Sequence, residues 1–357
     1  MFGSVKPDRE SASPAVVAFP ALAAPALSRA LLTPGPLPPL SHLGVTLLRH
    51  AVGTGLRYAL YQLGLPLPEA PPVRIVRLRL YLDDGKLALL LADAPGGAEV
   101  VAALSDPGGA GTLPPGARAL ATAAALHRAR LHLFSALPAG RPVDTTGSPA
   151  ELLARFRDEL SRGLPRTSDA LLADLLSALA RRARRAKGQE IPPALSRSAH
   201  RLLTGRTVDL HRFGPPDLFL PSWAATPERA EAARREAPAA SPMLPHDPLR
   251  GRFREAYRVL LDRLAPLYRA VAATATARGL LDTPEDAFFL PLDLAGDLTQ
   301  ECKPSWLESG VRANRAEYES ARKTTAPPER ITGPEEGVTV LLAEPRDWEL
   351  GPVLPLP

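Results

Sequence analysis

Proline is the feature of this sequence that most limits what the chain can fold into. There are 41 prolines among 357 residues, about twice the usual frequency of ~5%. Because proline lacks a backbone N–H and fixes φ, it interrupts helices and central strands. Much of the chain must therefore be broken by turns and linkers. We expect residues 1–40, which are rich in proline and alanine, to form an extended arm on the surface.

The composition still allows a sizeable hydrophobic core. Hydrophobic residues make up 45% of the chain and aromatic residues only 5%, so the core must be built largely from Leu, Ala and Val. A chain of this length can hold one large domain or two to three smaller ones. The net charge of +5 is a weak, spread-out excess, which does not by itself indicate a nucleic-acid partner.

The cellular compartment is constrained by cysteine usage and by apolar runs. Cys302 is the single cysteine, so no intrachain disulfide can form, which fits a reducing, cytoplasmic location. No apolar run approaches the ~20 residues of a membrane span. The apolar stretch at residues 15–27 is interrupted by Pro20 and Pro25 and follows Asp8 and Glu10, which disfavours a secretory signal peptide.

Most of the chain has helical periodicity. Apolar residues recur at three- and four-residue intervals in residues 41–64, where Gly64 and Pro66 end the pattern. Similar patterns, with Ser148–Pro149 and Thr167–Ser168 as helix starts, predict further helices over residues 117–137, 148–163, 168–187, 192–203, 247–278 and 306–323.

Two segments are typical of strands instead. Residues at about 73–92 alternate apolar side chains with arginine, reach a "DDGK" turn and continue as an apolar run, which predicts a β-hairpin. "GVTVLLAE", residues 337–344, predicts one terminal strand, which either docks a partner or folds back onto the hairpin. The predicted fold class is mainly α, a helical linker-type domain with one β-hairpin and a terminal strand. We divide the chain into an arm (1–40), a helical region with the hairpin (41–200), a second helical region (201–333) and a terminal strand and tail (334–357).

A glycine-closed helix followed by a short apolar plug marks the second helical region. Gly279 comes directly after the apolar-periodic residues of the segment 247–278, which is typical of a C′ glycine with positive φ. "AFFL", residues 287–290, is too apolar for a surface loop, so we expect it to fill a core.

From Arg206 to Gly333 a series of short motifs follows a fixed order. The residues that form it are Phe213, Gly214, Asp217, Leu218, Leu220, Pro221, Trp223, Arg254, Glu255, Arg258, Gly279, Glu285, Asp286, Phe288, Leu290, Arg315, Glu317, Tyr318, Pro327, Pro328, Ile331 and Gly333. This order resembles the central helical connecting region of phosphoenolpyruvate synthase-like and rifampin phosphotransferase-like enzymes. The hairpin upstream also looks like the strand pair that precedes the helices of that family.

The sequence departs from the family pattern at several positions, and these departures influence which function we expect. Pro215 and Pro216 replace the usual His-Arg of the first loop, Ser222 stands where arginine is usual, and Leu294 where glutamate is usual. The family works with an ATP-grasp domain and a swivelling phosphohistidine domain, and we find neither in this sequence. The resemblance therefore implies a non-catalytic subunit or remnant that docks a separate ATP-grasp or swivelling-domain protein. It implies no cofactor and no catalytic residue in this chain.

The candidate contact residues for a substrate or an interface come from the same motifs: Arg254, Glu255, Arg258, Arg315 and Glu317. Arg254 and Arg258 lie one turn apart on one helix face, where they can orient an anion. In a helical linker such arginines more often tie helices together through carboxylates, so we favour the structural role. Glu317, Asp286 and Asp293 are the partners that we expect.

Two alternative functions remain open at this stage. In one, the chain acts as a phosphotransferase in trans and supplies substrate-binding residues to the phosphohistidine of a partner. In the other, "RRARRAK" at residues 181–187 makes it a basic module for nucleic acid or an anionic surface. No stacking aromatics are interleaved with these arginines, so a solvated helix end is favoured. His200 is disfavoured as a phosphoryl carrier, and the seven histidines and Cys302 lack the spacing of a metal site.

Overall fold

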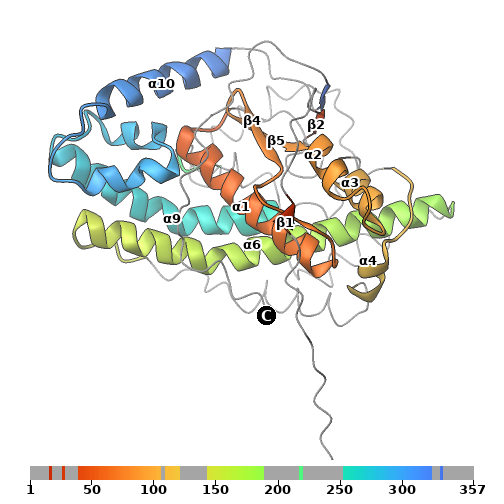
Figure 1. Ribbon diagram of the computed structural model, residues 1–357. Helices are drawn as coiled ribbons and strands as arrows, with labels where there is room; N and C mark the ends of the chain where they lie inside the picture. Colours follow the sequence, from red (N-terminus) through yellow and green to blue (C-terminus); the bar gives the residue numbers. More distant parts are fainter. Residues whose placement is uncertain are drawn as a thin grey trace, which may run out of the picture.

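The computed structural model describes residues 16–17, 26–28, 39–105, 109–120, 143–188, 217–219, 252–323 and 330–332. This part of the chain is mostly helical with a small sheet, which confirms the mainly α class with a hairpin (Figure 1). Its helices are α1 (His42–Gln62), α2 (Asp84–Leu90), α3 (Gly97–Ser105), α4 (Pro115–Leu120), α6 (Pro149–Ala186), α9 (Arg252–Ala277), α10 (Leu307–Lys323) and the 3₁₀ helices η2 (Pro284–Phe289) and η3 (Leu292–Thr299). The helix predicted over residues 192–203, and most of the one over 117–137, lie outside the described residues.

Helix α1 begins and ends at the residues that its sequence pattern predicts. The Ser41 side chain accepts a hydrogen bond from the Gly44 N–H at 3.0 Å, as an N-cap does. At the other end, Gly64 has φ +69°. Its N–H donates to the Tyr61 carbonyl, and the Leu65 N–H donates to the Leu60 carbonyl. These two bonds form a Schellman motif, which satisfies carbonyls that the helix itself leaves unpaired.

Helix α6 corrects the prediction of two helices over residues 148–163 and 168–187, because it runs unbroken for 38 residues with Pro165 inside it. Pro165 cannot donate a helical hydrogen bond. The Thr167 and Ser168 hydroxyls, which looked like helix caps, instead donate back to the Leu164 carbonyl at 2.8 and 2.9 Å. Helix α9 also packs closely against this turn of α6, since a β-carbon at Gly163 would collide with Leu260 of α9. Tertiary packing therefore overrides the local break.

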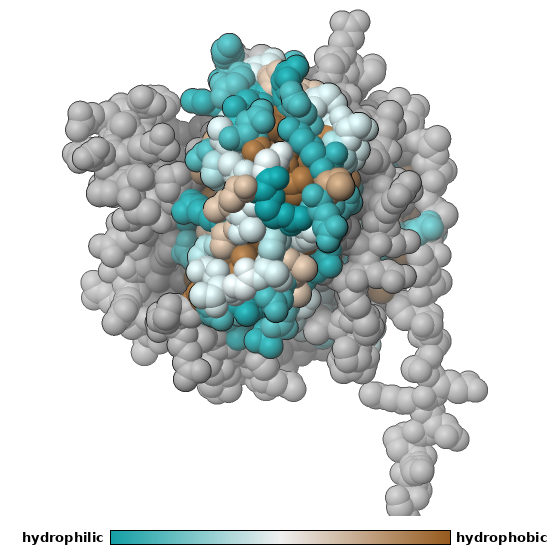
Figure 2. Space-filling view, turned by 90° about the vertical axis from the view of Figure 1, so that its left-hand side faces the viewer, coloured by the Kyte–Doolittle hydropathy of each residue, from teal (hydrophilic) through white to brown (hydrophobic). Residues whose placement is uncertain are grey.

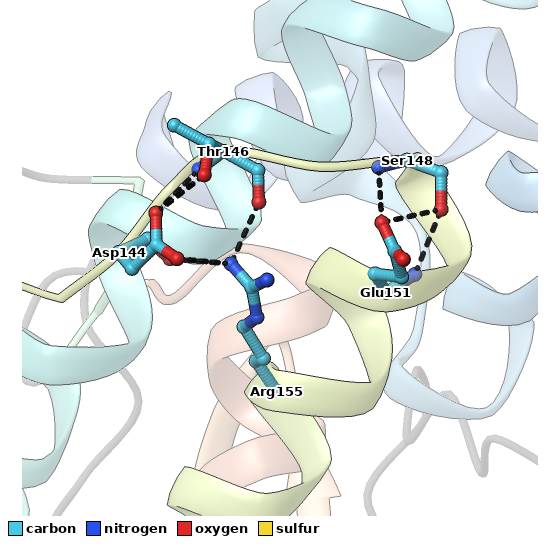
Figure 3. Close-up of polar contacts among 5 residues, drawn as sticks. All are labelled: Asp144, Thr146, Ser148, Glu151 and Arg155. Carbon is cyan, nitrogen blue, oxygen red and sulfur yellow. Dashed lines mark hydrogen bonds and ion pairs between the residues drawn. The ribbon is translucent and has the colours of Figure 1, made fainter.

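The start of α6 is fixed by two separate sets of polar contacts (Figure 3). Ser148 and Glu151 form a capping box, in which each side chain accepts a hydrogen bond from the backbone N–H of the other. One turn further on, Arg155 donates to the Asp144 carboxylate at 3.0 Å and to the Thr146 carbonyl at 2.6 Å. The chain that enters the helix is thus tied down before its first turn.

The core of the protein lies where α6 runs beside α9 and crosses α1 (Figure 1). The rings of Phe156 and Tyr268 meet between α6 and α9 with centroids 5.5 Å apart. Glu159 and Arg263 link the same two helices by a bidentate ion pair, with N···O distances of 2.6 and 2.7 Å. Helix α9 ends as predicted: Gly279 has φ +73°, and Leu280 closes a second Schellman motif on the Ala275 carbonyl.

The hairpin is shorter than the predicted range of about 73–92 and turns at a different place. Strands β4 (Val73–Val76) and β5 (Arg79–Asp83) are antiparallel. Their turn is Arg77–Leu78, with φ of 47° and 57°, the conformation that a two-residue hairpin loop requires. "DDGK" is not a turn but the start of α2, because the Asp83 side chain caps the Lys86 N–H. The apolar run after it is helical and buries Leu87 and Leu90.

The hairpin belongs to a four-stranded sheet in the order β4-β5-β2-β6. Strand β2 (Ala26–Ser28) comes from the segment that we expected to be a surface arm, and β6 (Arg330–Thr332) follows α10. A separate two-stranded sheet pairs β1 (Val16–Val17) with β3 (Leu67–Pro68) in parallel. The terminal strand predicted at residues 337–344 lies outside the described residues.

The apolar plug is buried, as predicted. Phe288 and Phe289 of η2 are 5% and 3% exposed. The Tyr268 hydroxyl donates to the Ala287 carbonyl at 3.0 Å, which holds η2 against α9. The Asn314 side-chain amide donates to the Phe289 carbonyl at 2.7 Å, which holds α10 on the other side. Segment 284–290 therefore joins α9 and α10 to one core.

Candidate functional site

Several motif segments meet at the N-terminus of α1. We refer to Ser41, His42, Asp217, Phe219, η2 and the residues 314–318 of α10 as the motif junction. Asp217 is fully buried, and its carboxylate accepts hydrogen bonds from the Ser41 hydroxyl at 2.7 Å and from the Phe219 N–H at 3.1 Å. The Ser41 N–H donates to the same carboxylate. A negative group at this position also complements the positive end of the helix dipole.

The electrostatics around Asp217 are dominated by burial. Burial raises the pKa of this carboxyl above its ordinary value, against the hydrogen bonds from Ser41 and Phe219, which lower it. Burial also raises the pKa of Tyr257, and the nearby Asp217 adds to that effect. The Tyr257 hydroxyl is buried with no hydrogen-bond partner among the described residues. Helix α1 packs closely against Asp217, because a β-carbon at Gly44 would collide with the Asp217 carboxylate.

Aromatic rings connect this buried acid to η2 and α10. The Phe219 ring lies 5.7 Å from Phe288, 5.4 Å from Phe289 and 5.7 Å from Tyr318, measured between centroids. Such tilted and edge-on contacts are the favoured geometries of aromatic pairs. The three residues of the 217–219 segment that the structure describes are thus anchored by one carboxylate and one ring.

Arg315 lies at the edge of the motif junction. It donates from Nη2 to Asp286 Oδ1 at 2.6 Å, and its guanidinium lies 5.1 Å from the centroid of the Phe289 ring. Asp286 also accepts from the N–H and the hydroxyl of Thr283, at 2.9 and 3.0 Å. One carboxylate therefore caps η2 and fixes α10 at the same time.

Glu317 turns to a different partner. Its carboxylate lies 3.0 Å from Nε2 of His42, the first residue of α1. His42 is fully buried, whereas the Glu317 side chain is 31% exposed. The contact joins α10 to α1 directly, and one side of it faces solvent.

The other predicted contact residues lie on α9. Arg258 is buried on α9 and donates to Asp262 one turn further on, at 2.8 Å. Arg254 and Glu255 lie on the backbone of α9, and their side chains are outside the described residues. Asp286 and Glu317, which we expected as partners of Arg254 and Arg258, bond instead to Arg315 and His42. The expected pairing of Arg254 stays a prediction, because its side chain lies outside the described residues.

A groove of about 160 Å³ lies between η2, Lys303 and α10. Its apolar lining includes Leu281, Leu307 and Val311. Hydrophobic residues show between hydrophilic ones on the face of the molecule that carries these elements (Figure 2). The charged residues that line the groove are Asp282, Asp286, Lys303, Glu308, Arg312 and Arg315.

The charges of the groove balance one another. Lys303 lies 3.8 Å from Asp282 and 3.5 Å from Glu308. Arg312 pairs with Glu308 at 2.7 Å, and Arg315 pairs with Asp286. Three acids and three bases therefore neutralise each other, and the groove has no excess positive charge with which to attract a phosphorylated substrate.

The basic run at residues 181–187 divides into two parts. Arg182 is buried, and its Nη2 donates to the Ala110 carbonyl at 2.8 Å. Arg184, Arg185 and Lys187 are exposed on the last turn of α6, where cations complement the helix dipole. The end of α6 projects from the body of the protein (Figure 1). Arg182 therefore holds α6 against the loop at residue 110, which its charge alone did not indicate.

Sequence reasoning identified Asp217 as a motif residue but missed its pairing with Ser41, and it missed His42 altogether. Ser41 did stand out as the start of a helix, which is the signal for one half of that pair. His200 lies outside the described residues. Within the part of the chain that the structure describes, no group of three or more His, Cys, Asp and Glu side chains is placed to hold a metal ion. In the same residues, no helix is both long and apolar enough to cross a membrane.

Comparisons of this chain with protein-family models, with curated proteins and with solved structures gave no match.

Proposed function

We propose that this chain is a non-catalytic subunit of a phosphoenolpyruvate synthase-like phosphotransferase, which docks a separate protein carrying the ATP-grasp or the swivelling phosphohistidine domain. The proposal starts from the motif order in residues 206–333. One structural observation supports it: three of the charged motif residues are engaged within the chain. Arg315 bonds to Asp286, Glu317 to His42 and Arg258 to Asp262. Charged residues that pair within the chain stiffen a connecting unit, and they leave few charges with which to bind a substrate anion.

The docking segment in this proposal is the C-terminal one. In the enzymes that the chain resembles, the swivelling domain follows the segment that Ile331 and Gly333 match. Strand β6 (330–332) is the last described element, so residues 334–357 are the part of this chain nearest to such a partner.

A binding experiment tests this function. Proteins of the same organism that carry an ATP-grasp or a swivelling domain are purified and mixed with the chain, and complexes are measured by analytical ultracentrifugation. We expect one of them to bind the full chain. A chain truncated after residue 333 should keep its melting temperature but lose the complex. A full-length chain with residues 334–357 in scrambled order, which keeps the composition, should behave like the truncated one. Equal binding by all three chains would refute the docking segment.

A chemical experiment separates docking from catalysis in trans. The purified chain should not hydrolyse ATP and should take up no ³²P from labelled ATP or phosphoenolpyruvate. Acid-labile label on this chain that disappears in a His200→Ala variant would overturn the non-catalytic assignment. Label on an added swivelling-domain protein that forms only when this chain is present favours catalysis in trans, whereas label that forms equally without this chain supports docking alone.

A further inference from the structure

Strand β2 holds together two parts of the sheet that come from opposite ends of the sequence. On one side, Leu27 lies opposite Asp83 and Ser28 opposite Leu82 of β5. On the other side, the same residues lie opposite Ile331 and Arg330 of β6. Strand β6 is at the edge of the sheet, and among the described strands it pairs with β2. The connection of β6 to the hairpin therefore runs through three residues of the N-terminal segment.

The edge of β5 that receives β2 is buried and shaped by other contacts. Leu82 is 1% exposed and Asp83 is fully buried. The Asp83 carboxylate accepts a hydrogen bond from Arg74 Nε at 2.6 Å and caps α2 through the Lys86 N–H at 3.0 Å. Helix α2 in turn packs against β2. A strand edge in such a place needs a partner, because unpaired backbone groups in a buried site cost free energy comparable to a lost hydrogen bond.

We propose that the edge of β5 beside α2 is a strand-binding site, that residues 26–28 of the same chain occupy it, and that their presence fixes β6. The N-terminal segment then acts as a strap between the hairpin and the C-terminal strand. Removing it frees a buried strand edge that accepts an extended peptide by β-augmentation, and it releases residues 330–332 from the sheet. This role of residues 26–28 follows from strand pairing alone, whichever protein the chain docks.

Limited proteolysis tests the strap. The bond after Arg330 is a trypsin site within β6, and the bond after Arg263 lies within α9 and reports on the helical core. Three chains are compared by mass spectrometry: the full chain, a chain lacking residues 1–30, and a chain lacking residues 1–24. The last is the matched control, because it loses β1 but keeps β2. We expect cleavage after Arg330 to be at least tenfold faster in the chain lacking 1–30 than in the other two, with Arg263 protected in all three. Adding a synthetic peptide of residues 22–34 with Arg29→Gln, which trypsin cannot cut, should restore the protection of Arg330 in trans.

The strap is refuted if Arg330 is cleaved at the same rate in the three chains, if loss of residues 1–24 alone is enough, or if the peptide restores nothing. Should the shortest chain also lose protection at Arg263, a full-length Leu27→Pro variant replaces it, because proline removes one backbone N–H from β2 and leaves the rest of the chain intact. If the Leu27→Pro variant is cleaved fast after Arg330 while Arg263 stays protected, the strap is supported. If Arg330 stays protected in that variant, the strap is overturned.

Discussion

The Ser41 hydroxyl donates a 2.7 Å hydrogen bond to the Asp217 carboxylate, which joins two residues that are 176 positions apart. Ser41 is also the N-cap of α1. One short contact therefore fixes both the start of a central helix and the only described residues between 188 and 252, at 217–219.

Replacing Asp217 with alanine should destabilise the protein by roughly 2–4 kcal/mol, because the buried Ser41 donors would lose their acceptor. Urea-induced unfolding followed by circular dichroism measures the change. Asp144→Ala is the matched control, since its carboxylate is 62% exposed, and it should change stability far less. Equal effects of the two substitutions would mean that the Asp217 contacts contribute little.

The pH dependence of stability should reveal the burial of Asp217. Because burial raises its pKa in the folded state above the ordinary 3.8, the folded chain binds this proton more tightly than the unfolded chain. The stability from this group is then fully present below about pH 4 and is lost as the pH rises through the raised pKa. Asp217→Asn lacks this proton, so its deficit relative to the natural chain should shrink as the pH rises above about 4. A deficit that grows with pH would show that hydrogen bonds outweigh burial at this site.

Replacing Phe288 or Phe289 of the plug with alanine should lower the free energy of unfolding by roughly 3–5 kcal/mol in each case. Removing a buried ring loses its transfer free energy and also leaves a cavity. Both rings are almost fully buried in the motif junction. Trp306→Ala is the comparison, since that ring is 36% exposed. Thermal melting of the three variants checks the order, and a Trp306 variant as unstable as the Phe variants would contradict it.

The Glu159–Arg263 pair should make the contact between α6 and α9 sensitive to acid. The hydrogen bond from Arg263 lowers the pKa of Glu159 in the folded chain. The stability that the ion pair contributes is therefore present above the unfolded-state pKa of Glu159, and it is lost as the pH falls through the lowered folded-state pKa. Glu159→Gln should therefore cost roughly 1–2 kcal/mol near neutral pH and progressively less below about pH 4. Unfolding curves of both proteins at several pH values measure this, and a constant difference at every pH would exclude the ion pair as its cause.

The exposed end of the basic run should be dispensable, whereas its buried part should not. Arg184→Ala with Arg185→Ala should leave stability unchanged, while Arg182→Ala should lower it, because the Ala110 carbonyl loses its donor. Neither protein should shift nucleic acid in a gel at ~150 mM salt. A shift that the double variant abolishes would favour the nucleic-acid function, since phosphate contacts are steeply salt-dependent.

Local signals predicted the helix ends well. Ser41, Gly64 and Gly279 each act through backbone groups within a few residues, so their roles can be read from neighbouring sequence. Pro165 and the Arg77–Leu78 turn were misjudged because packing from distant segments decides them. Proline usually breaks a helix, and positive φ usually calls for glycine. In both places the surrounding contacts hold a conformation that the local residues disfavour.

Some residues of the motif junction were predictable from the sequence, but their pairs were not. The motif order pointed to Asp286, Arg315 and Glu317, all of which lie in the motif junction. Which charge meets which depends on how η2, α10 and α1 pack, and 275 positions separate His42 from Glu317. No spacing rule reaches over such a distance, so the sequence carried no signal for that contact.

The length of α6 has a consequence for how this protein is made. Its main neighbour, α9, begins at Arg252, far behind the end of α6 at Ala186. A ribosome adding roughly 5–20 residues per second needs several seconds to bridge that interval. During this time the apolar side of a 38-residue helix has emerged without the helix that packs against it most extensively. Chaperone binding to nascent chains should therefore peak between the synthesis of these two helices and end once α9 has left the exit tunnel.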